Sequence, residues 1–275
     1  MKNIENEFIE IFCHIDDFNQ IFINVLRTHQ VTDGTRKLIK SGRLDESEIM
    51  TIVIYFHLMH YRDFKHYYLF HVCKHMQSEF PGLLSYYRFV KFMQKVLLSI
   101  AVFLFTRYLS RCTGISFVDS TPISASYIKL ENSNKTLKVH AIEGSCSIGW
   151  FFGLMLNFII KEKSEMLFFI LTPVNVDNIQ PLTGSNQLTM IFRRLFRDKE
   201  YIFQSLFEKL FIDILRLITK LRTKLNNSLM FISDKTLFRK KSFVESVFDD
   251  LNNICQINNI RNRNSEGFII NLLSG

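Results

Sequence analysis

Three acidic residues that are far apart in the sequence stand where their side chains can meet. Asp119 ends the apolar run ISFVD, Asp198 ends the run IFRRLFRD, and Glu245 lies in an amphipathic segment. If the two runs are neighbouring strands, both aspartates emerge at one sheet edge and a helix can bring Glu245 over them. Three carboxylates together need cations, and a pair of Mg²⁺ ions about 3.5–4 Å apart suits in-line phosphoryl displacement. Among 26 acidic residues, spacing alone does not single out this triplet.

Basic residues are concentrated in the second half of the chain. Residues 1–60 carry six Lys or Arg against nine acidic residues, whereas residues 190–263 carry fifteen against eight. A basic surface of this density fits a polyanionic partner, because each neutralised phosphate releases counterions. Solvated helix faces are the simpler alternative. The candidate DNA-binding residues are Arg194, Lys199, Arg239, Lys240, Lys241, Arg261 and Arg263.

Composition limits the class of protein. A chain of 275 residues with 47% apolar residues suits one large or two medium domains, which excludes a disordered or fibrous protein. Five cysteines without a CxxC pair favour a reducing compartment. The longest apolar run, residues 96–105, is about half of what a bilayer span needs, and the first residues lack an export signal. We therefore expect a cytoplasmic protein without a membrane partner.

The first 110 residues are predicted to be helical. Asp45 and Glu48 have the spacing of a capping box and predict a helix from about residue 47 to 61. A second long helix is expected over residues 86–110, with Phe89, Phe92, Val96, Ile100 and Phe103 on its apolar face, and residues 1–27 are also predicted to be helical.

The pattern changes to strands after Gly114. The run that ends at Asp119 predicts a first strand, residues 147–160 and 166–175 a hairpin, the run before Asp198 a fourth strand, and residues 214–222 a fifth. Residues 201–211 and 234–257 are predicted to be helices, the second with Leu237, Val244, Val247, Leu251 and Ile254 on one face. This order indicates an α/β layer. The predicted domains are residues 1–110 and 111–275.

The local sequence around these acids resembles a known family. The segments GISFVDST, SIGWFFG, LTPVNVD, DKEYI and the run from RKKSFVES to INLLSG are similar, in order and spacing, to DDE transposases of bacterial insertion sequences, most closely the group catalogued as nine-eighty-two. SEIMTIVIYFH, YRDFKHYYLFHVCKH and SYYRFV extend the resemblance into the N-terminal half. The resemblance implies a five-stranded RNase-H-like domain behind a helical DNA-binding region.

The resemblance also implies roles for individual residues. The family motifs matched by FVDST, by residues 197–201 and by VES assign Asp119, Asp198 and Glu245 as catalytic ligands of two Mg²⁺ or Mn²⁺ ions. Metal-bound water would hydrolyse a phosphodiester at the element's end, and the freed 3′-hydroxyl would attack target DNA. The implied partners are double-stranded DNA, both element ends and target, and a second copy of the chain in a homodimer on DNA, at the nucleoid.

Several positions depart from the family pattern. Arg197 and Glu200 replace the glycines on either side of Asp198, Met155 and Asn157 replace a Lys and a His, and Asn252 replaces a Lys. The chain therefore keeps a second hypothesis open, a catalytically decayed relative that binds DNA without cleaving it. A structural helical protein with a basic face is a third.

Three further groups have competing interpretations. His71 and His75 have the i, i+4 spacing of a zinc site, against phosphate contacts or plain surface histidines. The tyrosines at positions 61, 67, 68, 86 and 87 are mostly expected in the core, with stacking on DNA as the alternative. Arg239, Lys240 and Lys241 precede Glu245 and form either a phosphate clamp or, through Lys241 and Asp249, helix ion pairs.

Overall fold

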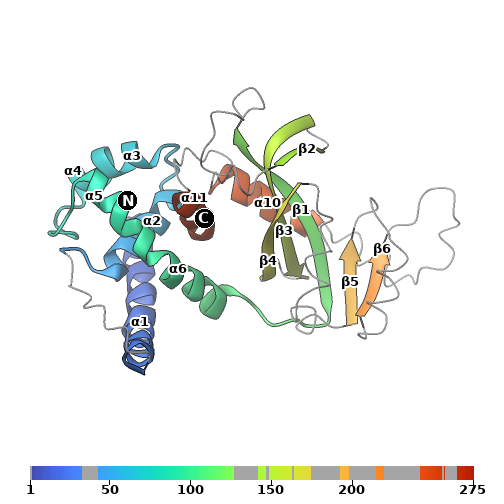
Figure 1. Ribbon diagram of the computed structural model, residues 1–275, viewed down its shortest axis with the longest axis horizontal. Coiled ribbons are helices and arrows are strands. Elements are labelled where there is room, and N and C mark those ends of the chain that lie inside the picture. Colours follow the sequence, from blue (N-terminus) through green and yellow to red (C-terminus); the bar gives the residue numbers. More distant parts are fainter. Residues whose placement is uncertain are drawn as a thin grey trace, which may run out of the picture. The chain divides into compact units, whose positions relative to one another are not determined.

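The computed structural model divides the chain into two compact units (Figure 1). It describes residues 2–32, 43–126, 142–146, 149–162, 164–174, 193–197, 215–219, 242–255, 257 and 265–275. Unit 1 comprises Met1–Arg107 together with Asn253–Gly275, and unit 2 comprises Tyr108–Asn252. The first boundary lies within three residues of the predicted one. Residues 253–275, which the sequence assigned to the second domain, pack with unit 1 because their apolar helix completes its core.

The described part of unit 1 is helical. Its elements, including short π-helical and 3₁₀ turns, are α1 (Lys2–Thr32), α2 (Glu46–Leu58), α3 (Phe64–Tyr67), η1 (Tyr68–Val72), α4 (Cys73–His75), α5 (Tyr86–Met93), η2 (Gln94–Val96), α6 (Leu97–Phe103), η3 (Leu104–Tyr108) and α11 (Ser265–Ser274).

The start of α2 confirms the predicted capping box. The Asp45 side chain accepts a hydrogen bond from the Glu46 amide at 2.8 Å, and the Glu48 carboxylate accepts one from the Asp45 amide at 2.7 Å. These bonds satisfy donors that a helix terminus leaves without partners inside the helix. Beyond the cap, α2 is buried on almost every side, so it forms the centre of the helical unit.

The predicted helix over residues 86–110 is confirmed as a continuous helical stretch from Tyr86 to Tyr108. Phe89, Val96, Ile100 and Phe103 are buried on its inner face, as expected, and Phe92 is half-buried. By length and composition alone this stretch could cross a membrane, although the core helix of a soluble protein passes the same test. The absence of a membrane partner stays a prediction.

The core of unit 1 is built largely from aromatic rings. The ring of Phe89 lies 4.5 Å from that of Tyr68 and 5.8 Å from that of Phe64. The buried hydroxyls find backbone acceptors, because Tyr67 donates to the Ile52 carbonyl and Tyr68 to the Leu84 carbonyl. Buried phenol rings thus contribute apolar area without leaving a polar atom unsatisfied.

The chain's last segment closes around His57 of α2. The ring Nδ1 lies 2.7 Å from the Cys255 carbonyl and Nε2 lies 3.0 Å from the Ser274 hydroxyl. Because a carbonyl only accepts, Nδ1 carries the proton. Burial lowers the pKa of His57 to about 4, so the ring is neutral at pH 7. A Cβ at Gly275 would lie 3.2 Å from Nδ1, so a glycine allows this close approach.

In its described residues, unit 2 has a mixed sheet of six strands and the helix α10 (Ser242–Asn253). The strand order is β2-β3-β1-β5-β6, with β4 also paired to β3. The β1–β3, β2–β3 and β3–β4 pairs are antiparallel, whereas β1–β5 and β5–β6 are parallel. The strands are β1 (Ile115–Ser126), β2 (Ile142–Cys146), β3 (Gly149–Lys161), β4 (Met166–Pro173), β5 (Arg193–Arg197) and β6 (Leu215–Thr219).

The sheet differs from the predicted one in two ways. Five strands were expected, and the sixth is β2, which pairs with residues 149–153 of β3 before β4 pairs with residues 154–160 along the same edge. The first strand was also expected to end at Asp119, but it continues to Ser126 with Pro122 inside it. On the side of β1 that faces β5, the described hydrogen-bonded pairs involve only residues 115–117. Proline lacks an N–H donor, and Pro122 lies beyond these pairs, so it is tolerated there.

The predicted helix over residues 201–211 and the first part of the one over residues 234–257 lie outside the described residues. The predicted inner face of α10 did not include Phe248, which is buried. Of the predicted residues whose side chains are described, Val247 and Leu251 are half-buried and Ile254 is exposed beyond the helix end. Phe248 is on the inner face because its ring packs against the ring of Phe158 on the sheet.

Candidate active site

Asp119 lies in the middle of β1, at the end of a row that crosses three strands. It pairs with Phe158 of β3, which in turn pairs with Phe169 of β4. Side chains of directly paired residues stand on the same face of a sheet. The rings of Phe158 and Phe169 lie 6.2 Å apart, so an apolar surface flanks the half-buried Asp119 on this face.

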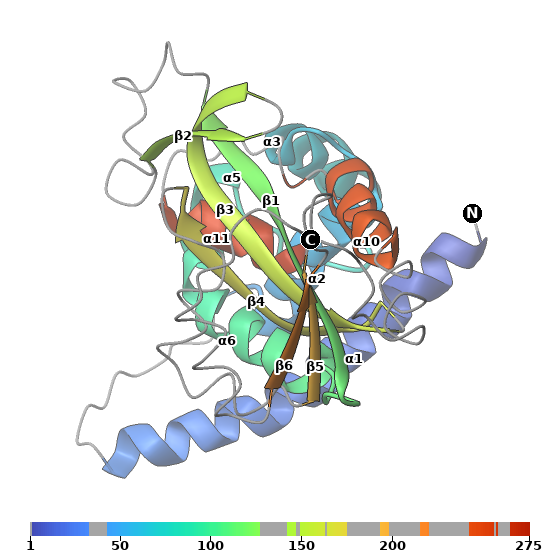
Figure 2. The ribbon, with the colours of Figure 1, turned by 90° about the vertical axis from the view of Figure 1, so that its right-hand side faces the viewer.

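The helix α10 covers the same face of the sheet. The ring of Phe248 lies 5.5 Å from that of Phe158 at an interplanar angle of 57°. Figure 2 shows α10 alongside β1 and β3. A helix held by this contact must pass close to the row that contains Asp119.

Glu245 precedes Phe248 by three residues, close to one turn of helix. Residues at this spacing lie on neighbouring parts of one helix face. Glu245 is exposed, in contrast to the buried Phe248. The packing of α10 therefore places Glu245 at the rim of the contact between helix and sheet, on the element that covers the Asp119 row.

The fourth predicted strand is β5, and it is the neighbour of β1 on the edge away from β3. The two strands are parallel, and Phe117 is in register with Phe196. This confirms the condition on which the meeting of the two aspartates depends. Asp119 follows Phe117 by two positions in the sequence, as Asp198 follows Phe196. Asp198 itself lies outside the described residues.

The donor atoms of this region suit a hard cation. The Asp119 carboxylate accepts a hydrogen bond from the Ser120 amide at 3.0 Å through Oδ1. A carboxylate offers about four lone-pair positions, so this bond does not exhaust its capacity. Carboxylate oxygens are the ligands that Mg²⁺ and Mn²⁺ prefer. In the described part of the chain no three His, Cys, Asp or Glu side chains form a metal-binding group, and Asp198 is not in that part.

Two departures from the family pattern lie away from this face. Asn157 pairs with Ser120 and Met155 with Pro122, so both alternate with Phe158 and stand on the opposite face from Asp119. Asn157 is buried and donates to the Thr172 hydroxyl at 3.0 Å. The replacement of a Lys and a His at these positions therefore changes the packing behind the sheet, and not the first contacts of Asp119.

Most of the predicted DNA-binding residues lie outside the described part of the chain. Arg194 belongs to β5, where its backbone is in register with Ile115. The others, Lys199, Arg239, Lys240, Lys241, Arg261 and Arg263, are not described, so the clamp stays a prediction.

The histidine pair does not gather further ligands among the described residues. The rings of His71 and His75 lie 5.9 Å apart. Burial, and then the neighbouring His75, lower the pKa of His71. No third His, Cys, Asp or Glu completes a metal group with them within that part of the chain.

Unit 1 carries a basic and aromatic surface, for which the sequence offered stacking of the tyrosines on DNA as the alternative to core packing. Tyr67 and Tyr68 are in the core, as expected, but Tyr87 is 71% exposed. Lysine ammonium groups lie over four aromatic rings, in the pairs Lys65–Tyr86, Lys74–Phe70, Lys91–Tyr87 and Lys95–Phe92. The sequence signal that could have revealed this surface is the complete lack of acidic residues over positions 86–108.

Comparison with known proteins gives one finding. A family model described as a transposase DDE domain matches residues 109–265, which is more than half of the chain. No curated protein and no solved structure matches. The matched range begins just before β1 and includes α10, so it contains all three predicted carboxylates.

Proposed function

Because the chain belongs to the transposase DDE domain family, we propose that it is a DNA transposase that cuts element ends and joins them to target DNA. Unit 2 would be the RNase-H-like catalytic domain, and Asp119, Asp198 and Glu245 its catalytic residues. The observation that carries this proposal is the adjacency of β1 and β5, together with the packing of α10 on the Asp119 row.

Asp119, Asp198 and Glu245 would hold the two Mg²⁺ or Mn²⁺ ions, which when bound supply an activated water and neutralise charge on the phosphate oxygens. The chain's own contribution is positional. The rigid β1–β3 ladder fixes Asp119, and the contact between Phe248 and Phe158 fixes the helix that carries Glu245. Side chains held on strands and helices keep their geometry better than side chains on loops. The aromatic row beside Asp119 also limits water on one side of the carboxylate.

Basic residues of the second half would bind DNA, and two element ends held together would require a homodimer on DNA. The residues proposed for this contact are Arg194, Lys199, Arg239, Lys240, Lys241, Arg261 and Arg263. A salt-dependent affinity is expected, since phosphate neutralisation releases counterions.

The proposal is tested with linear duplex DNA that carries the sequences flanking the coding region. The wild type should nick it in the presence of Mg²⁺, and Asp119→Asn and Glu245→Gln should each lower the rate by about 10³-fold or more. Asp250→Asn is the matched control, because Asp250 is an exposed acid on the same helix α10. It should keep the wild-type rate.

A specific observation supports a second candidate, a decayed relative that binds without cutting. Arg197 and Glu200 stand on either side of Asp198 where the family motif has glycines, and side chains there restrict a turn that needs φ > 0. If the wild type and Asp119→Asn bind flanking DNA equally and neither cuts it with Mg²⁺ or Mn²⁺, the transposase activity is contradicted and the decayed form is supported.

A further inference from the structure

The outer face of the helix that starts at Tyr86 carries only positive charge. Arg88, Lys91 and Lys95 are all exposed, and residues 86–108 contain no Asp or Glu. Solvent-facing helices usually mix both signs, because pairs at i, i+4 stabilise the helix. A rise of about 1.5 Å per residue separates the backbone positions of these three residues by about 4.5 and 6 Å along the axis.

Aromatic rings hold the ammonium groups of this face in place. The Lys91 nitrogen lies 4.8 Å from the centre of the Tyr87 ring, and the Lys95 nitrogen lies 4.3 Å from that of Phe92. Cation–π attraction of this kind restricts a lysine that would otherwise move freely in water. An anion that binds such a side chain loses less conformational entropy on association.

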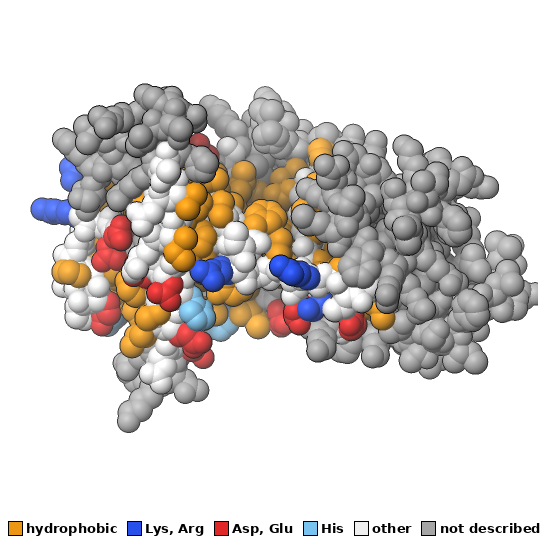
Figure 3. All heavy atoms as spheres, turned by 90° about the horizontal axis from the view of Figure 1, so that it is seen from below, with side chains coloured by type: hydrophobic (Ala, Val, Ile, Leu, Met, Phe, Trp, Pro, Cys, Tyr) orange, Lys and Arg blue, Asp and Glu red, His pale blue; other side chains and the backbone are white. Residues whose placement is uncertain are grey.

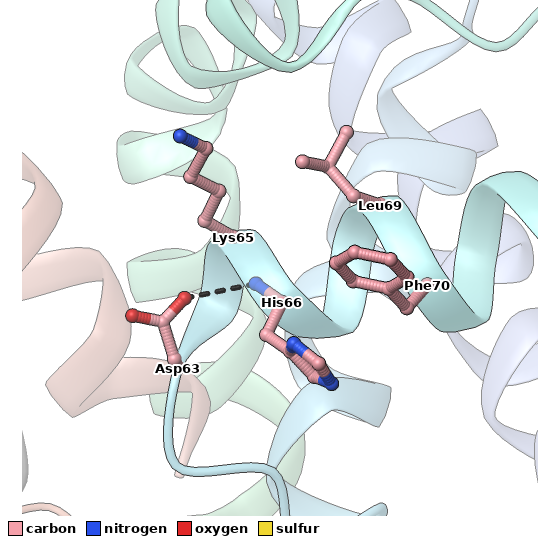
Figure 4. Close-up of a pocket in the computed structure, with 5 residues that line it drawn as sticks. All are labelled: Asp63, Lys65, His66, Leu69 and Phe70. Atoms are coloured by element: carbon pink, nitrogen blue, oxygen red, sulfur yellow. Dashed lines mark hydrogen bonds between the residues drawn. The ribbon is translucent and has the colours of Figure 1, made fainter.

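Lys65 extends the cationic face onto α3. Its nitrogen lies 5.9 Å from the centre of the Tyr86 ring. The nearby acid, Asp63, is engaged as the cap of α3, where its carboxylate accepts from the His66 amide at 2.8 Å. Figure 4 shows Lys65 extending away from Asp63, at the rim of a hollow of about 380 Å³. Within the described residues, no salt bridge involves Lys65, Arg88, Lys91 or Lys95.

Unit 1 is not uniformly basic. Residues 6–26 of α1 include four acids, Glu7, Glu10, Asp16 and Asp17, and no Lys or Arg. Figure 3 shows acidic, basic and hydrophobic side chains side by side on the face seen from below. Residues 62–95 carry six Lys or Arg against two acids. Among residues 1–107, the excess of positive over negative charge thus lies mainly in residues 62–95, whereas residues 1–60 carry six Lys or Arg against nine acids.

We propose that a cation–aromatic ridge on unit 1 binds the phosphate backbone of duplex DNA. The ridge consists of Lys65, Tyr86, Tyr87, Arg88, Lys91 and Lys95. The inference rests on the proposed function, because it assigns part of that enzyme's DNA contact to unit 1. Successive phosphates of one strand rise by about 3.4 Å along the duplex. Residues spaced by about 4.5 and 6 Å along the helix axis can therefore reach different phosphates of one strand. The contact is with the backbone and is independent of base sequence.

The test measures how the affinity of the full-length chain for a random duplex of about 30 base pairs depends on salt. It is done in EDTA, so that binding is read without cleavage. The ridge variant is Lys65→Gln/Arg88→Gln/Lys91→Gln. The matched control is Arg43→Gln/Arg62→Gln/Arg107→Gln, which removes three exposed cations of the same unit that belong to none of the lysine–ring pairs and leaves the same net charge. All six residues are exposed, and thermal unfolding verifies that both variants fold.

Each lost phosphate contact should lower the slope of log affinity against log salt by about 0.9. The ridge variant should therefore lose about 2 to 3 in slope and about a hundredfold or more in affinity near 0.1 M salt, whereas the control should keep the wild-type slope. The charge-keeping variant Lys65→Arg/Lys91→Arg should also keep it. Equal slopes in the ridge variant and wild type would overturn the proposal, and so would equal losses in both triple variants.

A membrane surface is the other polyanion that such a face fits. If the ridge variant loses binding to vesicles with about a third of anionic lipid but keeps the DNA slope, the DNA assignment is wrong. Failure of the two proposals is distinguishable. A wild type that never cuts, with a ridge variant that loses slope, contradicts only the catalytic proposal. A wild type that cuts, with an unchanged slope in the variant, contradicts only the ridge.

Discussion

Unit 1 and unit 2 place their ionisable groups in opposite surroundings. In unit 2 the candidate carboxylate Asp119 is half-buried at the end of an aromatic row, where a negative charge gains most from a bound cation. In unit 1 lysine ammonium groups lie over exposed or half-buried rings, and the buried His57 is neutral at pH 7. If both proposals hold, one unit attracts metal ions and the other attracts phosphates.

The two units also differ in what holds them together, and the core of unit 1 provides the largest expected effect. Phe89 is fully buried among the rings of Phe64 and Tyr68. Replacing it with Ala should lower the free energy of unfolding of unit 1 by about 4 kcal/mol, because a cavity replaces a ring at the centre of the cluster. Urea unfolding followed by far-ultraviolet circular dichroism measures the loss. The exposed Phe70→Ala is the control and should change stability little.

The corresponding change in unit 2 is Phe248→Ala. We expect a loss of about 3 kcal/mol, at the lower end for a buried Phe, because Phe248 still has 9% of its surface exposed. Since the contact with Phe158 positions the helix that carries Glu245, Mg²⁺-dependent cleavage should fall as well. DNA affinity in EDTA should stay close to that of the wild type. A cleavage rate that survives a measured loss of stability would contradict this role of α10.

The buried His57 makes the stability of unit 1 depend on pH. The unfolded chain takes up a proton at His57 near its ordinary pKa of 6.5, whereas the folded ring does so only near pH 4. Stability from this group is therefore complete above about pH 6.5 and falls as the pH is lowered toward 4, by about 2 kcal/mol between pH 7 and pH 5. The difference between wild type and His57→Gln, measured by urea unfolding across this range, isolates the effect. His14→Gln, on the exposed side of α1, should leave it unchanged.

The smallest expected effect is at the capping box of α2. Asp45→Ala removes the acceptor of the Glu46 amide and should cost about 1 kcal/mol in unfolding of unit 1. Asp45→Asn keeps a capping oxygen and should restore most of the loss. A thermal shift in Asp45→Asn as large as that in Asp45→Ala would show that the charge near the helix dipole, and not the hydrogen bond, is what stabilises this end.

Local signals in the sequence predicted local structure well. The helix beginning at Asp45, the helix from Tyr86 and the hairpin of β3 and β4 each follow from caps, periodicity or a polar turn between apolar runs. The pairing of β1 with β5 was the condition under which the two aspartates could meet, and the sheet fulfils it. These features depend on neighbours in the sequence or on one simple topological rule.

Features that depend on distant partners could not be read in the same way. The strand β2 is short and is held by its pairing with one end of β3. Its own sequence therefore has no pattern that predicts a strand. Phe248 was not on the predicted face of α10, because its burial depends on Phe158, a residue from another element. Pro122 led to the prediction that the first strand ends at Asp119. The strand can continue through this proline because the pairing with β5 stops at Phe117, which the sequence of β1 does not reveal.

The placement of residues 253–275 in unit 1 has a consequence during synthesis. His57 and the Ser274 hydroxyl that it contacts are 217 residues apart. At about 5–20 residues per second, a ribosome takes about 10–40 s to add the intervening chain. Throughout that interval the core of unit 1 lacks Ile270 and Leu273, which α11 contributes to it. We therefore expect nascent chains to expose apolar surface to chaperones until residues 265–274 have been synthesised.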